Sequence, residues 1–351
     1  MDINNLFRLA AEKGASDVHL LAGSAPTIRI DGQLLDINEL VGGGFPVLSG
    51  QDLIAFSDQI ITREQKTRFY DKRDLDLGHQ VDEYRYRVNL SFEKGNINIV
   101  ARVIDNKIPN MEEIGMPPVV KSLLDLPQGF VLITGPTGCG KSTTLASMIS
   151  YINANRRANI VTLEDPIEYI FAPEKSIISQ RQLGSDMLTF SSGLKHVLRQ
   201  DPNVVMVGEM RDLETIAAAV TMAETGHLVL ATLHTYSAAQ TVDRIIDIFP
   251  PHQQGQIKSQ LSGALTAVIS QRLLPRKSGG RIAAREILLN NSAVANLIRE
   301  GKVAQITNTI ETHASIGMIT LDKDIRRLYQ AGEIDREDAL RHVSDPNILD
   351  S

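Results

Sequence analysis

The nonapeptide Gly135–Thr143 constrains the fold of this chain more than any other stretch. It reads GPTGCGKST, matches the pattern G-x-x-x-x-G-K-[ST], and lies between the apolar run 130–134 and the helix-compatible run 144–149. Glycines allow consecutive backbone N–H groups to surround a polyphosphate, and a helix that starts near Lys141 adds the positive end of its dipole. The motif therefore predicts a phosphate-binding loop between a strand and a helix.

Each residue type in such a loop has its own task. Lys141 is expected to reach the β- and γ-phosphates, and the hydroxyl group of Ser142 is expected to ligate Mg²⁺. The alternative is a glycine-rich turn that only closes a strand–helix corner, but the full motif comes with the flanking strand and helix that confirm it. The predicted nucleotide-binding residues are Gly135, Pro136, Thr137, Gly138, Cys139, Gly140, Lys141, Ser142 and Thr143, with Ser142 as the metal ligand.

Composition and charge limit the other classes of function. The chain has 351 residues, of which 42% are hydrophobic, which allows two domains with cores of their own. Its net charge is −6 and it shows no local basic patch, so a nucleic-acid motor is disfavoured. The single cysteine, Cys139, excludes an intrachain disulfide and a cysteine-rich zinc site, which fits a reducing cytosol. Without a long apolar run or the basic start of a signal peptide, we expect a cytoplasmic protein that can dock on a membrane partner.

The first hundred residues mix helix and strand patterns. Residues 3–13 place apolar side chains on one helical face, and capping-box patterns that begin at Ser49 and Thr62 predict two more helices. The predicted strands are 18–21, 27–30, 34–37, 84–90 and 97–104, of which the last two form a hairpin. We predict a compact α+β domain over residues 1–104.

A proline-rich stretch separates this domain from a different pattern. Residues 105–128 carry four prolines between short apolar pieces, which suits an interdomain linker. Over residues 129–351, unalternated apolar runs are spaced by helices, which predicts a parallel sheet buried on both faces, the α/β layout of RecA-like ATPases. The runs are 130–134, 160–163, 204–207 and 228–233, with helices at 213–225 and 238–248. Beyond residue 252 we predict helices at 256–274, 293–300, 321–331 and 336–343, and one strand at 281–289.

Acidic residues follow two of these apolar runs. Glu209 comes just after 204–207, and a carboxylate at the carboxyl end of a strand beside the phosphate strand can act on attacking water. We predict Glu209 as the catalytic base; the alternative is an acid that only interacts with the dipole of the next helix. Glu164 is the second acid expected to face the nucleotide. For Asp165 and Glu168, a role at the nucleotide and the plain alternative, a turn before Pro166 and a solvated acid, stay equally open.

Histidines flank the run 228–233. A histidine in such a place often has only a structural role. His234, at the carboxyl end near the phosphates, is the better candidate for sensing the γ-phosphate, whereas His227 is expected to order a strand–helix corner.

Arginines line one face of the predicted hairpin. Arg85 and Arg87 share a strand face, and Arg102 lies on the return strand. Such a stripe is either the solvated face of a half-buried sheet or a set of arginines that a ring ATPase lends to the neighbouring subunit. The residues alone leave both alternatives open.

Together these motifs resemble the PilT group of type IV pilus retraction ATPases, within the larger secretion ATPase superfamily. The resemblance runs almost end to end, over segments 14–20, 28–32, 135–143, 162–168 (the Asp box), 207–215 (Walker B), 225–235 (the His box) and 293–300. It implies a PAS-like N-terminal domain, a RecA-like C-terminal domain and a ring of six subunits. It also implies that Arg87 and Arg102 reach a neighbour's nucleotide, which favours the functional alternative for them.

The chain departs from the family pattern at two positions. The family's loop usually has serine at the position of Cys139, a tolerant place, and the helix N-terminus is expected to lower the pKa of this thiol and make it reactive. The segment 293–300 reads AVANLIRE where the family has AIRNLIRE, so Ala295 stands in place of an arginine. ATP hydrolysis is expected to survive this change, whereas its coupling to pilus retraction is put in question.

The resemblance implies an ATP-driven motor at the cytoplasmic face of the inner membrane. Mg²⁺ and ATP would bind the loop, Glu209 and Glu164 would activate water, and the motor would act on a PilC-like platform protein to depolymerise pilin in twitching motility. One alternative is an extension or secretion ATPase, whose tetracysteine zinc element a single cysteine cannot build. Another is an accessory, PilU-like ATPase that acts through a second pilus ATPase, which Ala295 keeps open.

Overall fold

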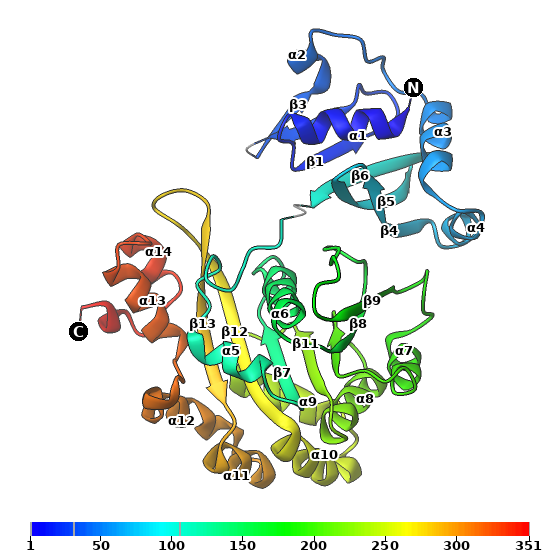
Figure 1. Cartoon of the computed structure of the whole chain (residues 1–351). Coiled ribbons are helices and arrows are strands. Elements are labelled where there is room, and N and C mark those ends of the chain that lie inside the picture. Colours follow the sequence, from blue (N-terminus) through cyan, green and yellow to red (C-terminus); the bar gives the residue numbers. More distant parts are fainter. Residues whose placement is uncertain (1, 31, 105–106, 351) are drawn as a thin grey trace. The chain divides into compact units, whose positions relative to one another are not determined.

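The computed structural model describes residues 2–30, 32–104 and 107–350. The chain divides into two compact units (Figure 1), Met1–Lys107 with Pro166–Ile170, and Ile108–Asp165 with Phe171–Ser351. From Ile108 on, the stretch predicted as a linker belongs to the second unit and includes the helix α5 (Pro118–Leu124). Five residues of the predicted segments lie outside the described residues: Met1, Asp31, Asp105, Asn106 and Ser351.

The first unit is built on a six-stranded antiparallel sheet in the order β3-β2-β1-β6-β5-β4. Its strands are β1 (Asp17–Leu20), β2 (Thr27–Ile30), β3 (Gln33–Asp36), β4 (Asp74–Val81), β5 (Tyr84–Glu93) and β6 (Asn96–Ile104). Its helices are α1 (Ile3–Glu12), α2 (Ile37–Val41), α3 (Gly50–Ile60) and α4 (Arg63–Lys72). The strand β4 is not among the predicted strands, and Ile37, expected at the end of a strand, begins α2.

One face of this sheet is apolar and packs on helices, as the alternation in β5 predicts. Tyr86 and Val88 are fully buried in a cluster with Ile3 and Phe7 of α1. The hydroxyl group of Tyr86 donates to the carbonyl oxygen of Phe7 at 2.8 Å, which satisfies its one polar group. Both predicted capping boxes are present, at the N-termini of α3 and α4.

The second unit contains a seven-stranded sheet in the order β13-β12-β7-β11-β10-β8-β9. Its strands are β7 (Gly129–Thr134), β8 (Asn159–Glu164), β9 (Ile177–Gln182), β10 (Val204–Val207), β11 (Leu228–Leu233), β12 (Leu265–Pro275) and β13 (Arg281–Leu289). Neighbours from β12 to β9 are parallel, and β13 pairs antiparallel with β12. Every residue of β7, β10 and β11 is buried, which confirms the prediction drawn from their unalternated apolar runs.

Helices cover both faces of this sheet (Figure 1). They are α6 (Lys141–Asn155), α7 (Phe190–Val197), α8 (Leu213–Glu224), α9 (Ala238–Asp247), α10 (Pro251–Ala264), α11 (Ser292–Glu300), α12 (Ile306–Thr312), α13 (Leu321–Gln330) and α14 (Arg336–Leu340), with 3₁₀ turns at Val303–Gln305, Ala314–Ile316 and Pro346–Leu349. Because parallel crossovers are right-handed, α6 covers one face and α7, α8 and α9 cover the other. The connections that leave the neighbouring strands β7 and β11 thus pass on opposite faces. Such a switch point opens a crevice at the carboxyl ends of the two strands.

The structure corrects the prediction of a helix over residues 256–274. The helix α10 ends at Ala264, and the following residues form β12 between β7 and β13. Thr266, Val268 and Ile269 are β-branched and favour an extended backbone, and pairing with β7 decides what the apolar pattern leaves ambiguous. The edge strand β9 is also absent from the prediction, whereas β13 has the predicted bounds.

The helices also bear on how the chain can meet a membrane. In the part of the chain that the structure describes, none of them has both the length and the apolar character needed to cross one. The longest, α6, follows the phosphate loop and carries the polar residues Lys141, Thr144 and Asn153 in buried positions.

Candidate functional site

The loop predicted to bind phosphate connects β7 to α6, which begins at Lys141. Its backbone requires glycine at two positions. Gly135 has φ +143°, and a Cβ atom there would lie 2.3 Å from the carbonyl oxygen of Gln271 and 2.6 Å from Cys139 Sγ. Gly140, at the N-terminus of α6, has φ +88°, in the left-handed region that side chains disfavour. The loop therefore packs directly on β12, which carries Gln271.

The side chain of Lys141 folds back onto the loop that precedes it. Its Nζ donates to the carbonyl oxygens of Gly135 at 2.8 Å and Pro136 at 3.0 Å. Burial lowers the pKa of Lys141, and electrostatic interactions with Cys139 and Glu209 offset only part of that effect. A buried ammonium group with little negative charge around it favours an anionic ligand, so the residues present fit a polyphosphate.

A chain of polar contacts leads from Lys141 to the predicted base. Lys141 Nζ lies 3.4 Å from His234 Nδ1, and His234 Nε2 lies 3.2 Å from Glu209 Oε1. The other oxygen of Glu209 accepts a hydrogen bond from the guanidinium group of Arg211 at 2.7 Å. The structure thus brings three of the predicted residues together and adds Arg211 to them.

The position of Glu209 in the sheet differs from the expectation. It follows β10, which does not lie beside β7, because β11 lies between the two strands. Because Glu209 is one strand further from the phosphate loop than expected, a side chain from β11 must connect it to the loop. His234, at the carboxyl end of β11, makes this connection.

The surroundings of Glu209 keep its carboxylate ionised. Partial burial raises the pKa of Glu209, but the hydrogen bond and charge of Arg211, followed by His234, lower it below its ordinary value. Its side chain is 21% exposed, so water can still approach it. An ionised and accessible carboxylate is what a general base requires.

Glu164 is held by its own strand and by β9. It is 7% exposed, and its Oε1 accepts from Thr162 Oγ1 at 2.6 Å and from Gln180 Nε2 at 3.1 Å. The backbone joins this strand to the Glu209 segment, since the N–H of Gly208 donates to the carbonyl oxygen of Leu163 at 2.7 Å. Glu164 therefore lies at the carboxyl end of β8, the strand beside β10, and its expected orientation toward the nucleotide stays a prediction.

The two other acids of the Asp box have separate surroundings. The negative charge of Asp165 contributes to raising the pKa of Arg211, after the hydrogen bond and charge of Glu209. Glu168 falls in the first unit, where its Oε1 lies 3.9 Å from a guanidinium nitrogen of Arg87. Asp165 therefore belongs to the surroundings of Glu209, whereas Glu168 belongs to those of the arginines.

The predicted arginines lie on the polar face of the sheet in the first unit. Arg87 of β5 and Arg102 of β6 are direct partners in the strand register. Asp17 of β1 is 7% exposed and accepts from Arg102 Nε at 2.8 Å, with Arg29 Nε 3.9 Å away. Burial raises the pKa of Asp17, but hydrogen bonds from Arg102 and Ser16 outweigh this effect and lower it. One buried carboxylate therefore holds Arg102 on this face and lies close to Arg29.

The structure corrects the expectation of a reactive Cys139. The thiol is 3% exposed, and burial raises the pKa of Cys139 despite the opposing influence of Lys141. A buried thiol with a raised pKa is a poor nucleophile. His227, by contrast, behaves as predicted: its Nδ1 lies 3.0 Å from the carbonyl oxygen of Met222, at the corner between α8 and β11.

Three residues of the site are not among those predicted from the sequence. Gln271 and Thr144 form a buried hydrogen-bonded pair against the loop, and Arg211 binds Glu209. Arg211 stands two residues after Glu209, so its spacing could have suggested a contact. Gln271 carried no such signal, since the pattern of residues 256–274 predicts a helix and its partners are more than a hundred residues away in the sequence.

A metal ion at this site would depend on the nucleotide. Among the described residues, no group of three or more His, Cys, Asp or Glu side chains could hold a metal ion. Ser142 is exposed at the start of α6, which leaves its hydroxyl group accessible. Because Mg²⁺ commonly takes few protein ligands besides phosphate oxygens and water, Ser142 fits the predicted role.

The chain is similar along almost its whole length to proteins that are already known. The family model described as "Type II/IV secretion system protein" matches residues 1–342. The type IV pilus retraction ATPase PilT of Pseudomonas aeruginosa is 45% identical over 99% of both chains, and the type IV pilus ATPase PilU of the same organism is 38% identical over 99% of this chain and 90% of its own. A crystal structure of the pilus retraction motor PilT with bound ADP superposes with a TM-score of 0.91 at 40% identity, covering 100% of this chain and 99% of that one. The resemblance to the PilT group is thereby confirmed, and the chain belongs to the family of type II/IV secretion system proteins.

Proposed function

We propose that this chain is an ATP-hydrolysing motor that powers type IV pilus retraction and thereby twitching motility. The observation that carries the proposal is the 45% identity to the retraction ATPase PilT along 99% of both chains. The chain is accordingly an ATPase that binds nucleotide. The proposal adds Mg²⁺, a ring of six copies, and a PilC-like platform protein as the partner at the cytoplasmic face of the inner membrane.

The contacts of the second unit support a mechanism in which each side chain has a defined task. Mg²⁺-ATP, when bound, supplies the phosphoanhydride that is hydrolysed. Lys141 and the loop amides hold its phosphates and neutralise charge, with Ser142 as a metal ligand. Glu209 orients water and takes its proton, Glu164 assists it, and His234 connects the base to Lys141.

The first unit supports a second part of the proposal. We propose that the first unit is a PAS-like domain and that the second unit, which includes residues 108–128 of the predicted linker, is the RecA-like domain. Arg87 and Arg102 are proposed to complete the site of the adjacent copy by stabilising negative charge in the transition state. Opening and closing between the two domains would then convert hydrolysis into motion of the platform protein.

The test of the enzymatic step is the variant Glu209→Gln, with Glu214→Gln on α8 as its matched control. We expect Glu209→Gln to bind ADP as the wild type does and to lose about 10²–10⁴-fold in kcat, because the amide cannot take a proton. Glu214 lies near Lys195, at 3.8 Å, and its variant should keep full turnover. Normal hydrolysis by Glu209→Gln would remove the assigned base.

One observation favours a second candidate function, that of an accessory pilus ATPase. Ala295 lies on α11 where the family has an arginine, and PilU of Pseudomonas aeruginosa is 38% identical to this chain. Deletion of the gene separates the two functions, with a complemented strain as control. Loss of retraction in a strain that keeps its other pilus ATPases supports the motor, whereas continued retraction supports the accessory role. The variant Ala295→Arg should strengthen retraction if this position limits coupling.

A further inference from the structure

A buried glutamine of β12 lies between the phosphate loop and α6. Gln271 is 2% exposed, and its Nε2 donates to the carbonyl oxygen of Cys139 at 2.7 Å. Its Oε1 accepts from Thr144 Oγ1 at 3.0 Å. Because a carbonyl oxygen can only accept, the contact with Cys139 determines which end of the amide is which. One side chain therefore links the strand, the loop and the first turn of the helix.

The same strand also supports the loop through its backbone. A Cβ atom on Gly135 would lie 2.3 Å from the carbonyl oxygen of Gln271, and one on Gly140 would lie 3.4 Å from Gln271 Nε2. Both ends of the loop thus pack against a single residue. Few other conformations of the loop are compatible with so close a contact.

The hydrogen bond to Cys139 determines the direction of a second group. The carbonyl of Cys139 and the N–H of Gly140 belong to one planar trans peptide, in which the two groups point in opposite directions. When Gln271 holds the carbonyl toward β12, the N–H of Gly140 must point away from β12. The amides of a phosphate loop act only when they point at the anion.

We propose that Gln271 is a positioning residue for nucleotide binding, which holds the Cys139–Gly140 peptide so that the N–H of Gly140 faces the phosphates. This inference rests on the proposed function, since it assumes that the loop binds a nucleotide. Gln271 itself does not touch the phosphates. Its loss leaves the buried carbonyl of Cys139 without its donor and allows the peptide to rotate.

The experiment compares ADP binding to full-length Gln271→Met, Ser270→Ala and the wild type by calorimetry, together with their melting temperatures. Methionine keeps the volume of glutamine and removes the donor. Ser270 is the matched control, because its buried hydroxyl group bonds Thr134 of β7 at 2.7 Å and, among the described residues, has no hydrogen bond to a loop amide. We expect Gln271→Met to raise the Kd for ADP about tenfold and Ser270→Ala to leave it within about twofold, at similar losses of stability.

A second variant covers the case in which Gln271→Met does not fold. Gln271→Leu has no polar atom and cannot donate to the carbonyl oxygen of Cys139 in any ionisation state, so it should also weaken ADP binding. Wild-type affinity for ADP in whichever variant folds overturns the inference, as does equal weakening by Ser270→Ala. Failure of the wild type to bind ADP overturns the proposed function instead.

Discussion

At the scale of single residues, the site is governed by competition between burial and charge. Burial alone would raise the pKa of Glu209 and lower that of Lys141, which would weaken both as charged groups. Arg211 and His234 reverse this effect at Glu209. At Lys141 the offset is partial, so the ammonium group gains most from an incoming anion. Neighbouring groups thus keep Glu209 ionised, whereas Lys141 stays short of negative charge until an anion binds.

The variant Arg211→Gln tests this account of Glu209. Because Arg211 lowers the pKa of Glu209, its removal should move the acid limb of kcat/KM to higher pH, so that activity is lost earlier as the pH falls. The shift is expected to be partial, because His234 and Lys141 still interact with the carboxylate of Glu209. Arg211 also interacts with Asp165, so only part of its positive charge acts on Glu209. The measurement is the pH profile of ATP hydrolysis.

The control for this profile is Arg336→Gln, which removes an exposed guanidinium group that pairs with Asp350 in the C-terminal region. Its acid limb should coincide with that of the wild type. An unchanged limb in Arg211→Gln would show that the ion pair does not determine the ionisation of the base.

At the scale of elements, β12 and β13 do more than extend the sheet. β12 carries Gln271 under the phosphate loop, and β13 carries Arg285, which is 2% exposed. The guanidinium group of Arg285 donates to the carbonyl oxygens of Ile114 at 2.8 Å and Gly115 at 3.0 Å. Burial lowers the pKa of Arg285 to about 10, so it stays charged at neutral pH. One arginine therefore attaches part of the predicted linker to the sheet.

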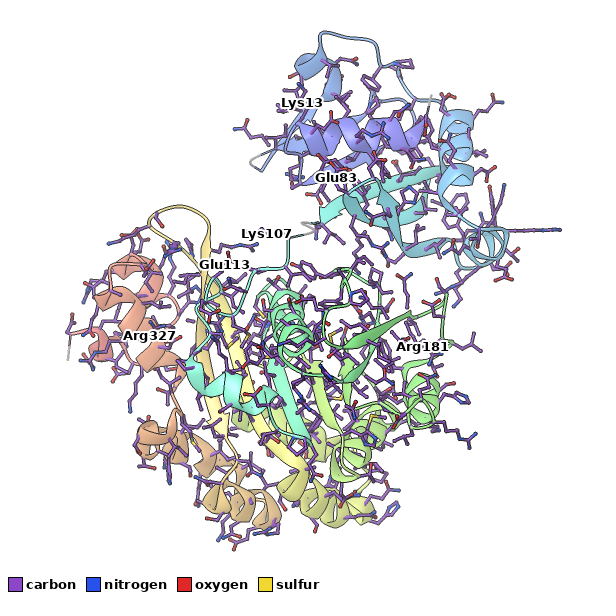
Figure 2. All side chains as sticks on the ribbon, viewed as in Figure 1. Lys13, Glu83, Lys107, Glu113, Arg181 and Arg327 are labelled. Carbon is purple, nitrogen blue, oxygen red and sulfur yellow. The ribbon has the colours of Figure 1, made fainter. Side chains whose placement is uncertain are left out.

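This strand also contacts the C-terminal helices. The backbone N–H of Arg285 donates to Asp324 Oδ2 on α13 at 2.7 Å, and Arg327 of the same helix (Figure 2) donates to the other oxygen at 2.7 Å. Because Arg327 compensates the charge of Asp324, loss of the Arg285 guanidinium group does not leave a buried carboxylate unpaired. Removal of the Arg285 guanidinium group therefore costs stability mainly through the lost hydrogen bonds to the carbonyl oxygens of Ile114 and Gly115.

The variant Arg285→Met should loosen the segment around Ile114 and Gly115. Two carbonyl groups lose a charged donor, so the second unit should be destabilised by about 1–3 kcal/mol. Limited proteolysis should cut this segment faster, and denaturant unfolding should report the loss of stability. Arg281→Met is the matched control, because Arg281 lies on the same strand with an exposed side chain. Equal protease resistance of both variants would contradict the role assigned to Arg285.

At the scale of the whole molecule, the two units carry different parts of the proposed site. The phosphate loop, His234 and Glu209 belong to the second unit, whereas Arg87 and Arg102 belong to the first. In a closed ring with head-to-tail contacts, each copy can lend its arginines to the next one. The proposed motor therefore has its complete sites at the seams between copies.

A mixing experiment tests this arrangement. Lys141→Ala and Arg102→Ala should each be nearly inactive, but rings assembled from an equal mixture should regain activity, because about a quarter of their seams combine an intact lysine with an intact arginine. ATP hydrolysis of the mixture is compared with that of each variant alone. Light scattering with and without ATP should show the mass of six 38.6 kDa chains.

Two outcomes would contradict the proposal that complete sites form between neighbouring copies. A mixture no more active than its components would place the arginines in the same copy as the loop or outside the reaction. Full turnover by a monomeric wild type would remove the need for a ring altogether.

The sequence alone determined the features that depend on neighbouring residues. The phosphate loop, the capping boxes at Ser49 and Thr62, and the buried strands β7, β10 and β11 were predictable because spacing and local patterning specify them. The placement of Glu209 at a strand end followed from the same patterns. For these features the nearby chain supplies both the backbone conformation and its chemical role.

Only the tertiary structure decided how distant segments complete one another. The β12 run is a strand because β7 and β13 pair with it, and β11 lies between the loop strand and Glu209 because of the order in which the sheet assembles. The contacts of Gln271 and Arg285 likewise join residues far apart in the chain. Distant segments also bury the thiol of Cys139. Burial and pairing are properties of the folded molecule, so a local pattern cannot specify them.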